Sequence, residues 1–391
     1  MIHSLIIEKV VFGGEGLGFI AGKACFVPDV LPGEKVEVEV GQDKKNFLRA
    51  RLVRILEPSP HRVKPACFYT AHCGGCQYQH VSYKEELRIK ENQVREALIK
   101  ELELSDGSIG SIVPSDNQIR YRSSLTLHIP SSKKGGAGFI GKDNKSIIPV
   151  TDCLLADEKM RPLFGAKLRL RGGEDRISYK LSDTGECISD QEERFFRIRL
   201  GEESLVASSK GFIQNNLSIT EKIVTHLKSW VEESLPDTFF DLYAGIGTFG
   251  LLAAINAPKV ICFEENPHAL AALAMNREER EAARIEIIKG RVERTFPEYF
   301  SAHGKGKNVT VWMDPPRQGI EKRVCEFLSR QEGINRIGYL SCDLATLVRD
   351  LKIILSGGRY TIEKVQHYDM FPRTKHVEVA VFMRICDGKR I

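Results

Sequence analysis

The stretch Thr238-Phe-Phe-Asp-Leu-Tyr-Ala-Gly-Ile-Gly-Thr-Phe-Gly-Leu-Leu-Ala253 decides the fold of the C-terminal half. An apolar run is followed by a glycine-rich turn and then by a helical pattern, which is the order of a β/α unit. Gly245 and Gly247 let backbone amides approach a ligand directly. Ligands of an open α/β sheet bind outside the carboxyl ends of its strands, so we expect a binding site at this turn.

An acidic pair, Glu264-Glu265, ends the next apolar run about 20 residues further on, where a carboxylate can bind a ribose hydroxyl pair. Gly245-Ile-Gly-Thr-Phe-Gly250 satisfies the dinucleotide fingerprint, so the glycine spacing alone leaves NAD open. Asp241 opens the turn as D-x-x-x-G-x-G, a form that resembles S-adenosylmethionine sites more than NAD sites.

Two later β/α units bring reactive residue types to the same edge. Val309-Thr-Val-Trp-Met313 leads into Asp314-Pro-Pro-Arg-Gln-Gly319, where two prolines fix an extended loop and direct Asp314 into the crevice. Arg336-Ile-Gly-Tyr-Leu340 is followed by Cys342, a nucleophilic residue type at a strand-to-helix edge. The alternatives are a turn aspartate and a buried structural thiol, because the chain holds ten cysteines.

A carboxylate also interrupts the last apolar strand. Glu378 lies within Val377-Glu-Val-Ala-Val-Phe382. Burial there would raise its pKa toward that of a useful general base, whereas an exposed sheet edge would leave it without a chemical role.

Length and composition indicate a multidomain α/β protein. The 391 residues suffice for two or three domains, with 28% charged and 42% hydrophobic residues. No run approaches the ~18 apolar residues of a membrane span, and the N-terminus lacks the basic and apolar regions of a signal peptide, so we expect a cytoplasmic protein. Cytoplasmic cysteines stay reduced, so clustered ones indicate metal binding or catalysis, and the net charge of +5 permits an anionic partner.

The first 58 residues form a unit of short β-type runs separated by glycine and proline turns, which predicts a small barrel of the oligonucleotide-binding kind. No helix follows the glycines at 13–18, so we do not expect a phosphate site there. Basic side chains crowd the last strand and its turn, and they form either a polynucleotide-binding stripe or a solvated face: Lys44, Lys45, Arg49, Arg51 and Arg54.

A cysteine cluster opens the next region, 59–210, which we expect to be α+β. Cys67, Cys73 and Cys76 have the spacing C-x5-C-x2-C, and Cys153 is our preferred fourth ligand ahead of His72 and His80. Four thiolates hold either tetrahedral zinc or an iron-sulfur cluster, and the spacing does not separate them. The pattern at 83–104 predicts an amphipathic helix capped by Ser82, with one apolar face made of Leu87, Val94, Leu98 and Leu102.

Taken together, five motifs resemble the RNA 5-methyluridine methyltransferase family: Phe212-x-Gln214-x-Asn216, Asp241-Leu-Tyr-Ala-Gly-Ile-Gly247, Asp314-Pro-Pro-Arg-x-Gly319, Ser341-Cys-Asp-x-Ala-Thr-Leu-x-Arg-Asp350 and Asp369-Met-Phe-Pro-x-Thr-x-His-Val-Glu378. The resemblance covers almost the whole chain. It implies an N-terminal OB-like TRAM barrel (1–58), a central iron-sulfur domain (59–210) and a Rossmann-like S-adenosylmethionine-dependent methyltransferase domain (211–391), with the helix at 83–104 packing on the last.

Residue by residue, the resemblance implies that Cys342 is the nucleophile and Glu378 the proton acceptor. The implied S-adenosylmethionine contacts, of which the first and last also reach the target uracil, are Gln214, Tyr243, Glu264 and Asp314. The implied [4Fe-4S] ligands are Cys67, Cys73, Cys76 and Cys153. Ala244 replaces a cysteine that many relatives have, and this change should affect only the packing of the turn.

The implied function is S-adenosylmethionine-dependent methylation of C5 of a specific uridine in RNA. The TRAM barrel with the cysteine set favours 23S ribosomal RNA over transfer RNA, and we expect no membrane and no obligate protein partner. A non-catalytic RNA-binding iron-sulfur protein is disfavoured by the joint presence of Gln214, Asp314, Cys342 and Glu378. A 5-methylcytosine enzyme would carry Pro-Cys, an N6-adenine enzyme would have an aromatic residue at Arg317, and a radical enzyme would have C-x3-C-x2-C.

Overall fold

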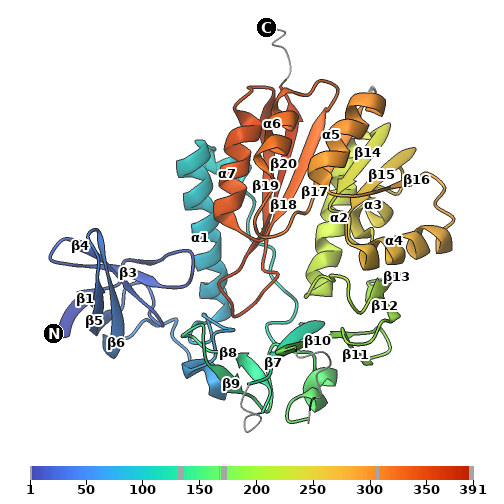
Figure 1. Cartoon of the computed structure of the whole chain (residues 1–391). Helices are drawn as coiled ribbons and strands as arrows, with labels where there is room; N and C mark the ends of the chain where they lie inside the picture. The colour runs from blue at the N-terminus through green and yellow to red at the C-terminus, as the bar shows by residue number, and fades with distance from the viewer. Residues whose placement is uncertain (1, 131–135, 167, 169–173, 305–307, 387–391) are drawn as a thin grey trace.

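The computed structural model describes residues 2–130, 136–166, 168, 174–304 and 308–386, which form four sheets. The N-terminal sheet stands to one side, and α1 (Tyr83–Leu102) lies between it and the large C-terminal sheet (Figure 1). The two small sheets lie below the C-terminal sheet in the same view. Within the described residues, no helix is long and apolar enough to cross a membrane.

The N-terminal sheet pairs in the order β1-β5-β6-β4-β3-β2. Its strands are β1 (Ile2–Ile6), β2 (Lys9–Val10), β3 (Gly16–Ile20), β4 (Lys23–Val27), β5 (Lys35–Asp43) and β6 (Phe47–Glu57). Gly16 and Gly18, which the pattern assigned to a turn, lie inside β3. A side chain would not fit at Gly18, because its Cβ would meet the Ile6 carbonyl oxygen at 2.5 Å. Strands β1 and β3 are in contact, yet the ladder between β1 and β2 is not closed in the described part, so the predicted closed barrel is seen as an open six-stranded sheet.

The predicted basic stripe on β6 is largely neutralised by the neighbouring strand. The register of β5 and β6 sets Glu37 opposite Arg54 and Glu39 opposite Arg51, and both pairs form ion pairs. Arg49 is paired as well, with Glu15 at 3.3 Å. The sequence of β6 alone could not reveal these partners, because they lie outside this strand: Glu37 and Glu39 in β5, and Glu15 just before β3. The stripe is therefore reduced to Lys44 and Lys45 at the turn.

Two small sheets form the central region. The first has the order β11-β10-β7-β8-β9, and the second pairs β12 with β13. Their strands are β7 (Ser124–His128), β8 (Gly138–Ile140), β9 (Ile147–Pro149), β10 (Arg176–Leu181), β11 (Cys187–Ser189), β12 (Phe195–Leu200) and β13 (Glu203–Ser208). Short 3-10 helices lie at η1 (Phe68–Ala71), η2 (Asp106–Ser108) and η3 (Glu158–Leu163).

The C-terminal sheet has seven strands in the order β16-β15-β14-β17-β18-β20-β19. These are β14 (Thr238–Leu242), β15 (Lys259–Glu264), β16 (Ile285–Lys289), β17 (Val309–Met313), β18 (Arg336–Ser341), β19 (Tyr360–Tyr368) and β20 (Glu378–Ile385). Strand β20 runs antiparallel between β18 and β19, which departs from the 3-2-1-4-5-6 order of dinucleotide-binding folds. The sheet topology therefore argues against the NAD alternative.

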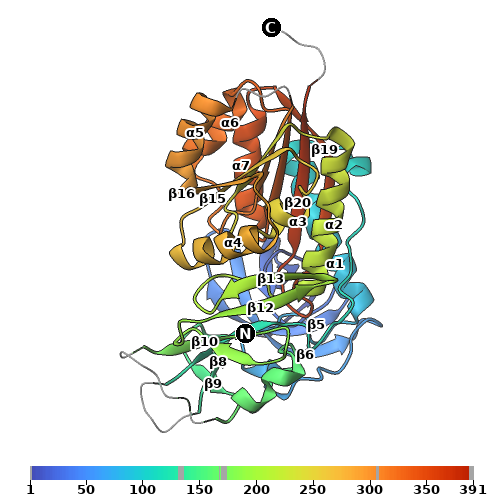
Figure 2. The same cartoon turned by 90° about the vertical axis from the view of Figure 1, so that its right-hand side faces the viewer.

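Helices cover both faces of this sheet (Figure 2). They are α2 (Leu217–Ser234), α3 (Thr248–Leu252), α4 (Pro267–Glu279), α5 (Val292–His303), α6 (Lys322–Arg330) and α7 (Leu344–Leu355). Helices α2, α3 and α4 share one apolar core with one face, and α5, α6 and α7 share another core with the opposite face. Neighbouring strand residues alternate between the two: Phe239 belongs to the first core and Phe240 to the second.

Helix α1 packs against α7 and places Val94 and Leu98 in the second core. Its predicted apolar face is incomplete, because Leu87 is only half-buried while Glu86 and Lys90 are fully buried. Ser82 occupies the N-cap position without a side-chain hydrogen bond to the helix. The buried charges are balanced by residues near the C-terminus of the chain, which the local pattern could not reveal.

Candidate active site

Three of the predicted reactive side chains meet at one edge of the C-terminal sheet. Cys342 follows β18 directly, and Asp343 caps α7 by accepting a hydrogen bond from the Thr346 amide. Asp314 follows β17, the strand next to β18. Glu378 opens β20, and the pairing of Ser341 with Val379 brings it beside Cys342. Two parallel strands and the start of an antiparallel strand thus deliver the three groups to the same place.

The surroundings of Cys342 keep its thiol protonated at neutral pH in the free protein. Burial first, and then the nearby carboxyl groups of Glu378 and Asp314, raise the pKa of Cys342 to about 12, although the guanidinium of Arg317 opposes this shift. The sequence placed this cysteine at the strand edge but could not give its charge state. A thiolate at this position requires a base to take its proton.

Both neighbouring carboxyl groups also have raised pKa values. Burial raises the pKa of Asp314 to about 7, although a hydrogen bond from Gln214 Nε2 at 3.0 Å opposes the shift. Burial and the Asp314 charge raise the pKa of Glu378 well above its ordinary value, and Arg317 opposes this. Glu378 is 4% exposed, so it lies inside the site and is not a solvated edge residue. Burial thus raises the pKa of both carboxyls, and because their charges interact they titrate as a coupled pair.

The glycine turn after β14 is organised by acidic side chains. Glu264 at the end of β15 accepts from the Gly245 amide through Oε2 at 2.8 Å, and its Oε1 accepts from the amides of Glu265 and Asn266. Asp241 is fully buried, accepts from the Gly250 amide at 2.8 Å, and has one carboxyl oxygen without a partner in the described part. The carboxylates of Glu264 and Asp241 thus stabilise the conformation of the turn by accepting hydrogen bonds from its backbone amides and from the start of α3.

The space next to Gly245 in this turn is open. Within the described residues, and apart from its two chain neighbours, no atom lies within 4 Å of the position that a Cβ of Gly245 would take. Tyr243 adopts a φ of 63°, and its hydroxyl donates to Glu293 at 3.1 Å. The amide of Asp314 lies 3.4 Å from the Leu242 carbonyl oxygen, so the turn adjoins the Cys342 site. A nucleotide-like ligand at the turn would reach the reactive cysteine, with the carboxylate of Glu264 beside it.

The four predicted metal-ligand cysteines line one cavity, although Cys153 is far from the others in sequence. Cys73 bridges to Gly141 next to β8, and the Gly74 amide donates to the Ile140 carbonyl at 3.0 Å. The Gly75 amide and the Gln79 side-chain amide donate to Sγ of Cys73 and Cys76 at 3.5 and 3.6 Å. All ten cysteines of the chain are free thiols. Neither His72 nor His80 lines this cavity.

The chemistry of this cavity suits an anionic sulfur-ligated group. Arg122 lies in the wall, and its buried Nε has no partner within the described residues. Burial raises the pKa of Cys76 to about 12, and the Arg122 charge opposes this shift. In the described part of the chain, however, no three His, Cys, Asp or Glu side chains are close enough to hold a single metal ion. The cavity gathers the thiols, but it does not by itself define a metal centre.

Comparison with known proteins identifies the family. Residues 198–385 match the family model described as tRNA (Uracil-5-)-methyltransferase, and residues 4–53 match the TRAM domain. An RNA methyltransferase of Treponema denticola, named as uncharacterized, is 30% identical over 96% of this chain and 98% of its own length. The chain belongs to this family of RNA methyltransferases. It is an RNA (uracil-C5)-methyltransferase with an N-terminal TRAM domain.

A second relative also bears the name of an RNA methyltransferase, and a solved structure shares the fold. A Bdellovibrio bacteriovorus protein, also named as an uncharacterized RNA methyltransferase, is 30% identical over 97% of this chain and 94% of its own. The solved structure described as Pyrococcus abyssi tRNA (uracil-54, C5)-methyltransferase in complex with S-adenosyl-L-homocysteine is 22% identical, with a TM-score of 0.73. It covers 97% of this chain and 99% of that chain, which shows a shared fold.

Two residues near the site were not predicted to take part. Arg317 influences the pKa of both Cys342 and Glu378, and its position in Asp-Pro-Pro-Arg next to Asp314 was the available signal. Phe212 is 66% exposed and lies two residues before Gln214. An exposed aromatic ring at that place offers a face on which a base can stack.

Proposed function

We propose that this methyltransferase modifies C5 of a specific uridine through a covalent adduct between Cys342 and C6 of the base. The observation that carries the proposal is the convergence of Cys342, Asp314 and Glu378 at the edge of β17, β18 and β20. C5 of uracil is a poor nucleophile, and addition of sulfur at C6 places electron density on C5. A nucleophile flanked by two carboxyls of raised pKa suits this chemistry.

The steps balance with groups on the chain. The Asp314 carboxylate takes the thiol proton, and the Sγ–C6 bond forms as electron density moves to C5. C5 then attacks the methyl group of S-adenosylmethionine, so that the C5–CH3 bond forms while the S–CH3 bond of the sulfonium breaks and S-adenosyl-L-homocysteine leaves. C5 of the adduct then carries both methyl and hydrogen, and Glu378 removes that hydrogen as a proton, after which the Sγ–C6 bond breaks. The target base must leave its stack for C6 to meet Sγ.

We place S-adenosylmethionine at the glycine turn, with Gln214, Tyr243, Glu264 and Asp314 as its contacts. Gly245 is open above, and Glu264 lies where a ribose hydroxyl pair would bind. The neighbour from Pyrococcus abyssi, described in complex with S-adenosyl-L-homocysteine, supports this assignment. Gln214 and Asp314 share a hydrogen bond at the rim, so both can also contact the target uracil.

We further propose that Cys67, Cys73, Cys76 and Cys153 hold a [4Fe-4S] cluster. The shared cavity, the two N–H···S contacts and the unpartnered Arg122 Nε all suit an anionic cluster. Methyl transfer has no net redox change, so the role of the cluster would be structural or in RNA positioning. We also propose three domains: a TRAM barrel at 1–58, a cluster-binding domain at 59–210 and a methyltransferase domain at 211–391. The proposed location of the protein is the cytoplasm.

The RNA substrate that we propose is 23S ribosomal RNA, which the combination of a TRAM domain with four cysteines favours. Transfer RNA is the second candidate, because both the family description and the Pyrococcus abyssi neighbour name it. Mass-spectrometric mapping of 5-methyluridine in RNA from a deletion strain tests both. Loss of one site in 23S RNA, restored by the wild-type gene and not by the Cys342→Ala gene, would support the first candidate, and loss in transfer RNA the second. Unchanged 5-methyluridine in both RNAs would contradict the proposed function.

A further inference from the structure

The loop between β19 and β20 spans residues 369–377 and leads directly into Glu378. Tyr368 and Glu378 form the last pair of the ladder, so the loop begins and ends at this pair. On its other side, Glu378 continues into a strand that is paired with both β18 and β19. The backbone of Glu378 is therefore fixed by the sheet in one direction and by the loop in the other.

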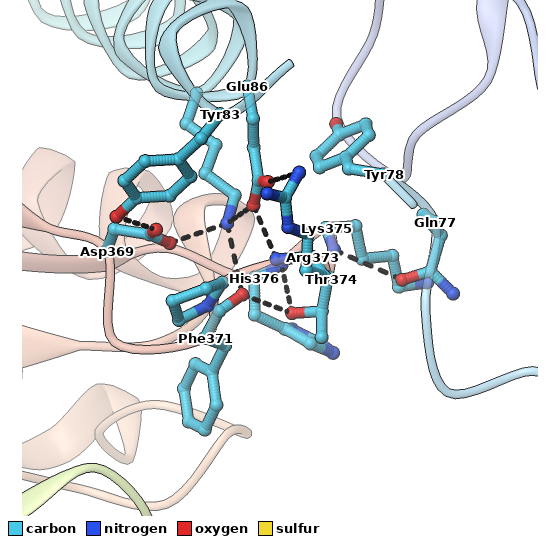
Figure 3. A network of polar contacts seen from close by, with 12 residues as sticks. Gln77, Tyr78, Tyr83, Glu86, Asp369, Phe371, Arg373, Thr374, Lys375 and His376 are labelled. Atoms are coloured by element: carbon cyan, nitrogen blue, oxygen red, sulfur yellow. Dashed lines mark hydrogen bonds and ion pairs between the residues drawn. The ribbon is translucent and has the colours of Figure 1, made fainter. Parts of the chain in front are cut away.

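The cysteine-bearing segment holds the loop at two points. The backbone amides of Gln77 and Tyr78 both donate to the carbonyl of Arg373 at 3.1 Å. The side-chain oxygen of Gln77 accepts from the Lys375 amide at 3.1 Å (Figure 3). Gln77 follows Cys76 directly, so the segment that carries three of the cavity thiols, Cys67, Cys73 and Cys76, also binds the loop before Glu378.

Helix α1 holds the same loop through buried charges (Figure 3). The fully buried ammonium of Lys90 donates to Asp369 at 2.6 Å, to Glu86 at 2.8 Å and to the Phe371 carbonyl at 3.1 Å. Glu86 in turn accepts from the Arg373 amide at 2.6 Å. Buried charges are costly unless they are paired, so these contacts define one position of the loop.

The loop needs these contacts because its own conformation is unfavourable. Arg373 has a φ of 67°, in the left-handed region that a residue with a Cβ rarely adopts. Its guanidinium donates to the Val81 carbonyl at 2.8 Å and to the side chain of Gln118. Partners from outside the loop thus maintain a strained turn.

The nucleophile does not depend on this loop. Cys342 is fixed between β18 and the capped N-terminus of α7. Release of the loop would therefore let the first residue of β20 move while Cys342 stays in place. Of the two chemical roles, proton removal at C5 would suffer first, and addition and methyl transfer would continue.

We propose that Gln77 is a positioning residue for proton removal: by binding the Arg373–Lys375 turn, it holds Glu378 against C5 of the methylated adduct. This inference rests on the proposed function. It links the cysteine segment to the proton-removal step, because a change in the conformation of Cys76 would move Gln77 and thereby displace Glu378, the general base.

The test compares two signals from one adduct. Unmodified 23S ribosomal RNA and transfer RNA transcripts containing 5-tritiated uridine are mixed with excess enzyme and S-adenosylmethionine carrying a 14C-methyl group. Methyl incorporation reports addition and transfer, and tritium release reports proton removal. We expect Gln77→Met to lower the ratio of tritium released to methyl transferred in the first turnover by at least about fivefold, with a methylated, SDS-stable complex accumulating. The ratio is independent of the folded fraction, so a partly unstable variant stays informative.

The matched control is Gln93→Met, which removes a second glutamine of the same region; Gln93 is buried, whereas Gln77 is half-buried. Gln93 lies on α1 and donates to the Val10 carbonyl and the Tyr78 hydroxyl, outside the loop. It should keep the wild-type ratio, and Gln77→Glu, which retains an acceptor for the Lys375 amide, should lie closer to wild type than Gln77→Met. A wild-type ratio in Gln77→Met would overturn the inference. A wild-type enzyme that neither forms the adduct nor releases tritium would instead overturn the proposed function.

Discussion

The side-chain amide of Gln214 donates to Oδ2 of Asp314 at 3.0 Å, joining the loop before α2 to the end of β17. This bond favours the carboxylate form of Asp314, yet burial still raises its pKa to about 7. Asp314 in turn raises the pKa of Glu378. The amide is thus too weak a donor to keep both carboxyls ionised at neutral pH.

Activity should consequently rise with pH through the neutral range. Proton removal requires an ionised carboxylate. Burial raises the pKa of Asp314 to about 7 and that of Glu378 well above its ordinary value, so the rate falls as the pH drops through the neutral range. The release of tritium from RNA containing 5-tritiated uridine, measured in a single turnover between pH 5.5 and 9, tests this pH dependence. A profile that is flat across this range would contradict the assignment of a buried carboxyl as the base.

Asp314→Asn should stabilise the protein while it abolishes function. The folded-state pKa of Asp314 is raised, so the folded protein holds a proton that the unfolded chain has lost, and stability falls as the pH rises from about 4 to 7. The amide keeps an acceptor for Gln214. Thermal unfolding at pH 8 should occur at least about 2 °C higher than in the wild type, and the difference should vanish near pH 4. An equal or lower unfolding temperature at pH 8 would count against a destabilising carboxylate here.

Replacement of Cys342 by Ala should abolish both methyl transfer and adduct formation with RNA that contains 5-fluorouridine. The loss in rate should reach at least about 10³-fold, because no other group can add at C6. Gel electrophoresis under denaturing conditions detects the adduct. Cys386→Ala is the control, since Cys386 is exposed and lies outside the site. An adduct that survives in Cys342→Ala would assign the nucleophile elsewhere.

Glu378→Gln should separate the two halves of the reaction. The amide cannot accept the C5 proton, so methylated enzyme–RNA complex should accumulate while methyl transfer proceeds through one turnover. Quantifying the complex against released 5-methyluridine RNA measures the block. Turnover at the wild-type rate would remove Glu378 from the mechanism.

Protein purified without oxygen should be brown and contain about four iron and four sulfide per chain. Cys153→Ser should lose most of this iron, because Cys153 lines the cavity with the other three thiols. Cys187→Ser is the matched control, since Cys187 is also partly buried but lies outside the cavity. A colourless, zinc-loaded wild-type protein would contradict the cluster.

Local sequence could predict the edge positions because parallel strands end at a common side of a sheet. Gly245, Asp314 and Cys342 each follow an apolar run, so their convergence follows from the topology of the β/α units. Glu378 could be placed in a strand but not in the site, because its neighbour is determined by the antiparallel insertion of β20. The local sequence pattern does not indicate that β20 runs antiparallel to β18.

Contacts across long separations escaped prediction for a different reason. Lys90 was not among the residues of the predicted apolar face of the helix, and it is buried because Asp369 and Glu86 neutralise it. The arginines of β6 were predicted to form either a binding stripe or a solvated face, and Arg51 and Arg54 are paired because the register of β5 places Glu39 and Glu37 opposite them. In each case the partner's position depends on tertiary structure, which a short window of sequence does not contain.

The separation of 279 residues between Lys90 and Asp369 has a consequence for biosynthesis. Chains emerge at about 5–20 residues per second, so α1 leaves the ribosome roughly 15–60 s before the residues that cover it. Throughout that interval Lys90 and Glu86, one helical turn apart, can pair with each other and stay hydrated. This part of the surface of the nascent helix is therefore charged and hydrated, which disfavours aggregation. The enzyme becomes active only after its last strands have been synthesised.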